Sequence, residues 1–491
     1  MIIFIINIAM TAKVLILNPP SPDANHINRD LMGGMGVKNS LGSNILSTLI
    51  TKMKNAYVHI PVLQLVYAAT LLKRAGIELL VIDAATEDLK LSDIMPKITT
   101  FRPEYVIMAC SASCFIFERD VVAKQIKENC PGVKIIVEGE MINERPDLLI
   151  PNFDIAILGE VETSIVNICS EEEVKNVSNI AYAQNNEVIK TNKTGRLEKE
   201  QLEELPFPDW SLFPYRKYRY YPMVSRTPLV TIQASRGCPY GCGYCPYPTN
   251  QGLKWRARDA KNIFEEIKHC YEKFGVRGFF FRDPLFSLSQ KRVDDLCKLL
   301  IESKLNVGFV FETRPELLKK ETIELLAKAG CECINLGVED INPGILKLIN
   351  RKPLDIDKIL ETVRLLHKYG IRTSCFFIIG LPGSTKQTIK ETIDFSLKLL
   401  PNQVEYKIAT PFPGTQLYDM AKENKWLKSE TLDLLGGYSA AMQISKELTP
   451  EYLEKEVNNA FNRFYFSPRF LFREFIQGRI FKDVGFLLKQ F

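Results

Sequence analysis

The chain has 491 residues, of which 46% are hydrophobic and 25% charged, and its formal net charge at pH 7 is +5. These proportions are typical of a globular protein, and the length predicts two or three domains that each bury a core. A charge excess this small argues neither for nor against nucleic acid, which clustered charge would indicate, and we expect no nucleic-acid partner.

Twelve cysteines are diluted over the chain, and no secretory signal precedes them. For nine of them the sequence indicates reduced, buried thiols of a cytoplasmic protein rather than a disulfide scaffold. Residues 1–10 are apolar but too few to span a bilayer, which needs about 20 residues. A translation start at Met10 instead of Met1 explains them at least as well as an anchor, so we expect a cytoplasmic protein that is at most peripheral to a membrane.

From residue 13 onward, short β-branched runs alternate with amphipathic helical stretches, which predicts a parallel sheet with helices on both faces over residues 11–170. The expected strands are 13–18, 79–83, 105–109, 134–138 and 155–158, with helices at 62–75 and 117–129 among the stretches between them. Ligands bind beyond the carboxyl ends of such strands. The small or polar residues found there, where a large flat ligand would approach the backbone, are Asn18, Ser111, Ser113, Gly139, Glu140, Gly159 and Glu160.

The pattern weakens over residues 171–227, which we expect to be a linker. Asn185-Asn186 predicts the turn of a small hairpin, and the proline-punctuated residues 206–210 (Pro-Phe-Pro-Asp-Trp) predict an extended segment. We expect this stretch to lie along the surface of the next domain.

A second strand–helix series occupies residues 228–430, with strands expected at 229–234, 278–281, 307–311, 333–336, 372–379 and 403–408. The helices expected between them are 259–273, 291–302, 315–329, 357–369 and 385–399. Six such units are fewer than the eight of a closed barrel, so an open, partial (β/α)6 barrel is predicted. Residues 431–491 predict a helical extension.

The strongest chemical signal is Cys238-Pro-Tyr-Gly-Cys242-Gly-Tyr-Cys245, which follows a predicted strand. Three thiolates in one loop are soft ligands, suited to an iron–sulfur cluster or zinc. A structural zinc site needs a fourth ligand, and an electron-transfer cluster needs a fourth cysteine at a different spacing. No second Cys-x-x-Cys, no Cys/His pair at zinc-finger spacing and no ferredoxin-type run follows the motif, so we expect a [4Fe–4S] cluster with one open iron.

This motif is similar to that of the radical S-adenosylmethionine (SAM) superfamily. The resemblance implies that the open iron binds SAM, that one electron cleaves SAM to methionine and a 5′-deoxyadenosyl radical, and that Tyr244 lies near the adenine. It also implies a low-potential electron donor such as ferredoxin or flavodoxin.

Further matches fall at successive strand ends, where a barrel of this type carries its chemistry. In the light of the resemblance they are expected to contact SAM, and an arginine suits a bidentate grip on its carboxylate. These residues are Asp283, Glu312, Arg314, Glu339 and Gly380. Taken singly, the carboxylates are equally explained as surface charges or ion-pair partners, and the glycine as a plain turn.

Nearly the whole chain resembles the cobalamin-binding radical SAM enzymes, through Asn18-Pro19-Pro20, Ile82-Asp83-Ala84, Gly159-Glu160, the 206–210 linker and residues 464–469. The resemblance implies a flavodoxin-like Rossmann domain that binds cobalamin. Two features depart from it: no Asp-x-His-x-x-Gly motif is present, and Glu138-Gly139-Glu140 replaces the usual Gly-Gly. The alternative is a vestigial domain that only packs on the barrel.

The function implied is cobalamin-dependent C-methylation, or a related radical modification, of a small-molecule or lipid-like substrate. Two alternatives stay open: a cobalamin-free radical SAM enzyme that performs a cyclisation or rearrangement, and a non-catalytic iron–sulfur or cobalamin sensor. The basic and aromatic residues after Phe464 either cap the barrel or contact a membrane surface.

Overall fold

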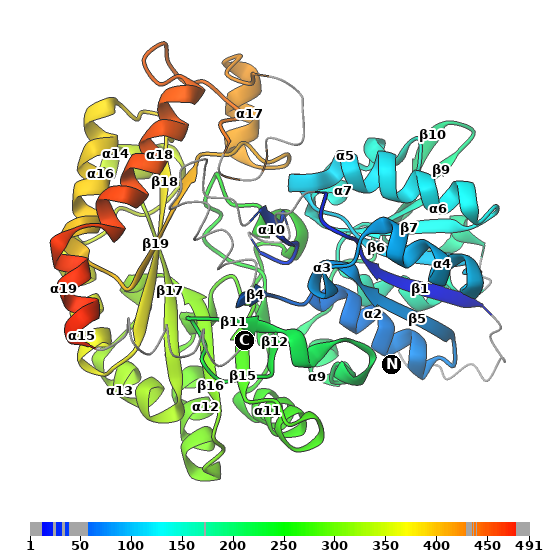
Figure 1. The fold of residues 1–491 in the computed structure, drawn as a ribbon, viewed down its shortest axis with the longest axis horizontal. Helices are drawn as coiled ribbons and strands as arrows, with labels where there is room; N and C mark the ends of the chain where they lie inside the picture. The colour runs from blue at the N-terminus through cyan, green and yellow to red at the C-terminus, as the bar shows by residue number, and fades with distance from the viewer. Residues whose placement is uncertain are drawn as a thin grey trace.

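The computed structural model describes residues 12–22, 26–31, 35–38, 57–170, 173–428, 435, 437 and 439–477. Residues 1–10 and the end of the tail, with Arg479, Phe481, Lys482 and Phe486, lie outside these ranges. The described chain forms an N-terminal α/β domain and a larger α/β barrel domain side by side (Figure 1). Among the described helices, none has the length and apolarity that crossing a bilayer requires.

The N-terminal sheet contains five parallel strands in the order β5-β1-β6-β7-β8, the 2-1-3-4-5 order of a doubly wound sheet. They are β1 (Lys13–Asn18), β5 (Glu78–Asp83), β6 (Tyr105–Ala109), β7 (Lys134–Glu138) and β8 (Ile155–Ile157). Leu15 and Leu17 of β1 pack on one face of the sheet, whereas Val14 and Ile16 pack on the other. A strand that is buried on both faces needs apolar side chains at every position, which explains the run Val-Leu-Ile-Leu.

Helices cover both faces of this sheet (Figure 1). Helix α2 (Leu63–Arg74) packs against the Val14 side. Helices α4 (Leu91–Phe101) and α6 (Lys124–Asn129) contribute to the core on the Leu15 side. The shorter helices of this domain are α3 (Ala84–Glu87), α5 (Phe115–Phe117), α7 (Glu140–Glu144) and α8 (Ile165–Ile168).

The hairpin expected in the linker belongs to the N-terminal sheet instead of lying on the next domain. Strand β9 (Ile180–Gln184) pairs antiparallel with β8, and β10 (Glu187–Lys190) pairs with β9. Asn185 and Asn186 both have positive φ, 49° and 61°, as a tight hairpin turn requires. The edge of β8 offers unpaired backbone groups, and the hairpin satisfies them.

The rest of the linker joins the two domains. Trp210 has no exposed surface and lies in a hydrophobic cluster that includes side chains of both domains. The hydroxyl of Tyr218, equally buried, donates a hydrogen bond to Asp83 Oδ2 at 2.6 Å. The aromatic residues of the linker therefore form a shared core.

The second domain is an open barrel of six parallel strands in chain order. They are β12 (Leu229–Ile232), β15 (Gly278–Phe281), β16 (Gly308–Thr313), β17 (Cys331–Glu339), β18 (Arg372–Ile379) and β19 (Gln403–Ile408). The outer helices are α11 (Ala260–Phe274), α12 (Gln290–Ser303), α13 (Lys320–Ala329), α15 (Ile356–Lys368) and α16 (Lys386–Leu399). The end strands β12 and β19 are not neighbours in the strand order, so the sheet is open, as expected of fewer than eight strand–helix units.

Two C-terminal helices cover the β19 side of the barrel. Helix α18 (Pro450–Tyr465) packs on β19 and α16, and α19 (Pro468–Ile476) follows it at the outer edge of the molecule (Figure 1). The Arg473 guanidinium donates hydrogen bonds to the carbonyls of Leu400 and Pro401, which fixes α19 to the start of β19. Two further helices, α14 (Pro343–Leu348) and α17 (Gln416–Glu423), lie near the barrel mouth.

Buried ion pairs connect the N-terminal domain to the segment that leads into the cysteine motif. The carboxylate of Glu160 lies 2.9 Å from Arg256 Nη1 and 3.3 Å from Arg236 Nη1. These arginines lie on the paired strands β13 (Ser235–Arg236) and β14 (Arg256–Ala257). Although burial opposes ionisation, the two guanidinium groups hold the pKa of Glu160 below its ordinary value. Glu160, expected at a cofactor, is therefore engaged by protein.

Glu140 makes a second contact between the domains. Its Oε1 accepts a hydrogen bond of 2.8 Å from Asn250 Nδ2, on helix α10 (Tyr247–Gln251) just after the cysteine motif. Burial raises the pKa of Glu140 to about 7, and burial also raises that of the neighbouring Glu138. Burial therefore favours the neutral forms of both carboxyl groups, and Glu140 contacts the other domain.

The raised pKa of Glu140 predicts a pH dependence of stability. Between its unfolded value near 4.5 and its native value near 7 the unfolded chain binds fewer protons, so the free energy of unfolding falls as pH rises through this window, by about 3 kcal/mol for this group. Glu140→Gln keeps the acceptor for Asn250 and removes the titration. Urea denaturation should show that the free energy of unfolding of wild type falls by this amount more than that of the variant when the pH is raised from 4.5 to 8. A pH-independent difference would contradict the assignment.

Candidate active site

Cys238, Cys242 and Cys245 follow β13 and line one cavity of about 620 Å³. All three are partly accessible, whereas the other nine cysteines are buried, as the sequence predicted. At Gly237 the loop passes close to the backbone just before β14. A side chain at this residue, which has a φ of 82°, would therefore collide with the Lys254 carbonyl oxygen. Glycine is required there.

The three thiols fit a polynuclear centre better than a single ion. No group of three or more His, Cys, Asp or Glu side chains in the described ranges is arranged around one metal ion, so the geometry does not match a tetrahedral zinc site. Burial raises the pKa of the Cys245 thiol, and the nearby Cys242 thiol adds a smaller effect in the same direction. Three cysteine ligands from one loop suit an iron–sulfur cluster, which binds thiolates.

Arg314 offers unused hydrogen-bond donors at the cavity wall. Its guanidinium lies 4.2 Å from the Tyr240 ring centroid, and its Nε lies 2.7 Å from Glu316 Oε1 in an ion pair. Apart from this ion pair, the guanidinium makes no hydrogen bond among the described residues, although the side chain is only 6% exposed. Buried donors without acceptors are costly, and a carboxylate ligand would satisfy two of them at once. This arrangement fits the carboxylate of SAM.

A second group of cavity residues surrounds Glu339. Its Oε1 lies 3.8 Å from Arg351 Nη1, which also lies 3.4 Å from the Tyr244 hydroxyl. Burial raises the pKa of Glu339, and Arg351 opposes that effect. The ion pair that was the alternative explanation for Glu339 forms with an arginine inside the cavity, and its contact with SAM stays a prediction. Strand-end reasoning missed Arg351 because it follows helix α14 instead of a strand.

Glu312 also lines the cavity and is not an ordinary surface charge. Its Oε1 lies 3.3 Å from Arg282 Nη1, and its Oε2 accepts a 3.5 Å hydrogen bond from the Tyr247 hydroxyl. Arg282 in turn pairs with Asp30 of the N-terminal domain, Nε to Oδ2, at 2.8 Å. The cavity wall is therefore connected by charge to the other domain.

Asp283 and Gly380 are not among the residues that line the cavity. Asp283 is fully buried, and its oxygens accept hydrogen bonds from the Ala234 amide (2.7 Å) and the Ser235 hydroxyl (2.5 Å). It shapes the chain just before the cysteine motif. A side chain at Gly380 would approach Leu453 of α18 to 3.0 Å. Contact between SAM and either residue stays a prediction.

The residues expected to face cobalamin are engaged by protein. The Asn18 amide donates to Asp83 Oδ1 at 2.7 Å, and the Ser111 amide donates to Glu118 Oε2 at 2.8 Å. Arg29 joins these groups, because it donates to Asn18 Oδ1 at 3.0 Å and pairs with Glu118 at 2.7 Å. The side-chain nitrogen and oxygen of Asn18 and the hydroxyl of Ser111 therefore already have hydrogen-bond partners among the described residues.

Residues 35–38 cover this edge of the sheet. The Ser113 amide donates to the Met35 carbonyl at 3.3 Å, and a side chain at Gly36 would approach the Ser111 Cβ to 2.8 Å. The Ser113 hydroxyl is buried without a hydrogen-bond partner in the described structure, and Gly159 borders open space. A corrin ring does not fit against Ser111 and Ser113 unless residues 35–38 move away.

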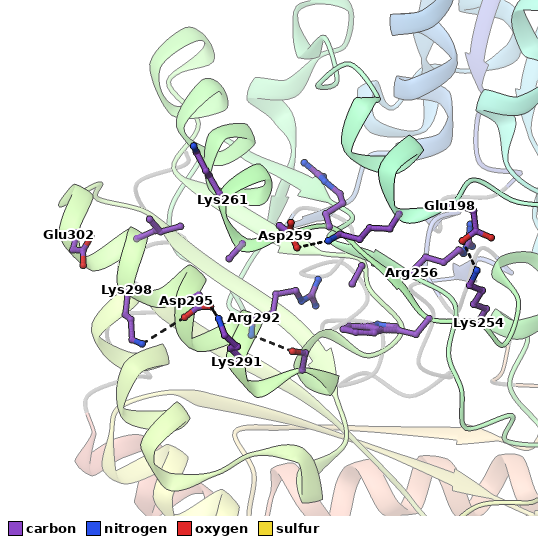
Figure 2. A pocket seen from close by; sticks show the side chains of 17 residues that line it. Glu198, Lys254, Arg256, Asp259, Lys261, Lys291, Arg292, Asp295, Lys298 and Glu302 are labelled. Carbon is purple, nitrogen blue, oxygen red and sulfur yellow. Dashed lines mark hydrogen bonds and ion pairs between the residues drawn. The ribbon is translucent and has the colours of Figure 1, made fainter. Parts of the chain in front are cut away.

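A larger hollow, of about 790 Å³, lies outside the barrel between β14, α11 and α12 (Figure 2). Charged side chains line it, and many of them pair with one another, as Lys291 does with Asp295 at 2.5 Å and Lys254 with Glu198 at 2.6 Å. It contains none of the three cysteines. The cavity at the cysteine motif is therefore the candidate active site.

Comparison with known proteins agrees with this geometry. Residues 232–396 match the model of the radical SAM superfamily. An uncharacterized methyltransferase of Pyrococcus horikoshii is 28% identical over 443 residues, which cover 88% of this chain and 92% of that protein. The anaerobic magnesium-protoporphyrin IX monomethyl ester cyclase of Rubrivivax gelatinosus is 28% identical over 370 residues, 72% of this chain and 64% of the cyclase.

The fold also matches a solved structure. The radical SAM methyltransferase TsrM of Kitasatospora setae, with cobalamin and a [4Fe–4S] cluster bound, superposes with a TM-score of 0.64 over 91% of this chain and 85% of TsrM, at 16% identity. The family match spans the cysteine motif and the cavity residues from Tyr240 to Arg351. Residues 232–396 of this chain therefore match the radical SAM superfamily, and the chain is similar in its two-domain fold to a radical SAM methyltransferase that was solved with cobalamin and the cluster bound.

Proposed function

We propose that this chain is a radical SAM enzyme that methylates a carbon atom of a small-molecule or lipid-like substrate. One observation carries the proposal: the three thiols of the cysteine motif and the unsatisfied guanidinium of Arg314 line the same buried cavity. When bound, the cluster supplies the electron that cleaves SAM to methionine and a 5′-deoxyadenosyl radical.

The chain's own residues position SAM and protect the radical. Arg314 binds the methionine carboxylate, and Tyr244 and Glu339 form the wall for the adenosyl group. Arg351 holds both of these side chains, because it lies 3.4 Å from the Tyr244 hydroxyl and 3.8 Å from Glu339. The aromatic and aliphatic walls of the cavity exclude water, which favours a reactive carbon radical.

Methylation is supported by the methyltransferase names of the Pyrococcus protein and TsrM. The cyclase of Rubrivivax represents the alternative of ring formation without methyl transfer. The N-terminal domain we infer to be a flavodoxin-like Rossmann domain of the cobalamin-binding type. Its strand order and the likeness to TsrM support this, whereas the cover over Ser111 and Ser113 opposes a corrin at that position.

A cysteine variant tests the cluster assignment. In Cys242→Ala only two thiolates remain, so the anaerobically reconstituted protein should lose the visible absorbance of the cluster and release no 5′-deoxyadenosine from SAM under dithionite. Cys130→Ala removes a buried thiol of the N-terminal domain and should change neither readout. A Cys242→Ala protein that still cleaves SAM would show that the cluster assignment is wrong.

A conservative substitution tests the role of Arg314 in SAM binding. Lysine keeps the charge but cannot make two parallel hydrogen bonds, so Arg314→Lys should weaken SAM binding by at least about tenfold. Equilibrium dialysis with labelled SAM measures this, and the cluster absorbance should stay at the wild-type level. Arg145→Lys, at an exposed ion pair with Asp147 in the other domain, is the matched control. Equal affinity in both variants would remove Arg314 from the SAM site.

Cobalamin retention and methyl transfer from SAM distinguish methylation from its alternatives. Protein reconstituted with hydroxocobalamin and then desalted should retain about one cobalamin per chain, and its product should carry one additional methyl group derived from SAM. Absorbance spectroscopy and mass spectrometry with methyl-labelled SAM give the two readouts. Cleavage of SAM without retained cobalamin would leave a radical SAM enzyme but refute the proposed role of the N-terminal domain.

A further inference from the structure

The cavity that contains the cysteines extends to the C-terminal helices. Its lining includes Phe461 and Tyr465 of α18 and Phe470 and Leu471 of α19, with Phe376 and Phe377 of β18 among the residues between them and the cysteine motif. With a volume of about 620 Å³ and mostly apolar walls, it suits a long, largely apolar molecule next to SAM.

The surface of α19 carries an apolar patch at the same place. Nine large apolar side chains are exposed in the described structure, and five of them fall between residues 466 and 476. Phe466, Leu471, Phe472 and Ile476 are 55%, 43%, 66% and 65% exposed. Single exposed apolar residues need no explanation, but a cluster marks an interaction surface. Leu471 belongs to both the patch and the cavity wall, so the patch adjoins one end of the cavity.

The charges around the patch are of one sign. Arg469 is exposed beside Phe472, whereas the single acidic residue between 466 and 477, Glu474, is 9% exposed and pairs with Arg473 at 2.8 Å. The outward surface of α19 thus presents apolar and basic groups without an exposed carboxylate. This is the composition of a helix that lies in the interface of a lipid bilayer.

We propose that α19 binds a lipid bilayer and that the cavity receives an elongated lipid substrate from that bilayer through the end formed by Phe470 and Leu471. The proposal rests on the proposed function for the reaction at the cysteine motif. Helix α19 lies at the outer edge of the barrel, away from the N-terminal domain, and Phe466, Phe472 and Ile476 are exposed among the described residues (Figure 1). Binding is peripheral, since the patch consists of about three turns of chain.

Flotation of the full-length, reconstituted protein with mixed phosphatidylcholine–phosphatidylglycerol vesicles tests this proposal. The double variant Phe472→Asp, Ile476→Asp changes two exposed residues that do not line the cavity. Its floating fraction should fall at least about tenfold below wild type. The matched control, Val121→Asp with Ile189→Asp, changes two 37% exposed residues of the N-terminal domain and should float like wild type.

SAM cleavage under dithionite, measured without vesicles, separates this proposal from the proposed function. All three proteins should release equal amounts of 5′-deoxyadenosine. Flotation of the double variant at the wild-type level, or no flotation of wild type, would overturn the membrane surface. The proposal would also be overturned if wild type formed a dimer and did not float while the double variant stayed monomeric. That outcome would assign the patch to contact with a second copy of the chain. Normal flotation without SAM cleavage would instead refute the proposed function.

Discussion

The buried ion pairs of Glu160 with Arg236 and Arg256 are the constraint on which the site depends. They hold β13 and β14 against the N-terminal domain, and the cysteine motif begins two residues after Arg236. Loss of one partner of a buried pair leaves an uncompensated charge and typically costs about 3–5 kcal/mol. The position of the three thiols is therefore coupled to the docking of the domains, so the two domains act as one unit.

Arginines contribute to the site in two distinct ways. Arg236, Arg256 and Arg282 are saturated by carboxylates or carbonyls and connect the domains. Arg314 is equally buried and forms one ion pair, with Glu316, yet its guanidinium makes no hydrogen bond in the described structure. Since an unsatisfied buried donor is costly, a protein retains it mainly where a ligand completes it. In the charged hollow of Figure 2, by contrast, many charged side chains already pair with one another, so it offers a ligand fewer free charges than the candidate active site.

The sequence by itself predicted the strands, the cavity cysteines and several cavity residues. Every parallel strand was predicted to within a few residues, because strands buried on both faces are continuous apolar runs that local sequence reveals. The cysteine spacing is equally local, and Glu312, Arg314 and Glu339 could be found because side chains that follow parallel strands meet at one edge.

Only the tertiary structure decided how the remaining polar residues are used. Glu160 and Glu140 stand at strand ends as a cofactor ligand would, yet their partners are on the other domain, 96 and 110 residues away in sequence. Arg351 enters the cavity from a helix end, and the linker hairpin joins the sheet of the first domain. Local pattern determines which residues form strands and which can ligate a metal. The partner of a buried charge depends on contacts between distant segments, which no local pattern encodes.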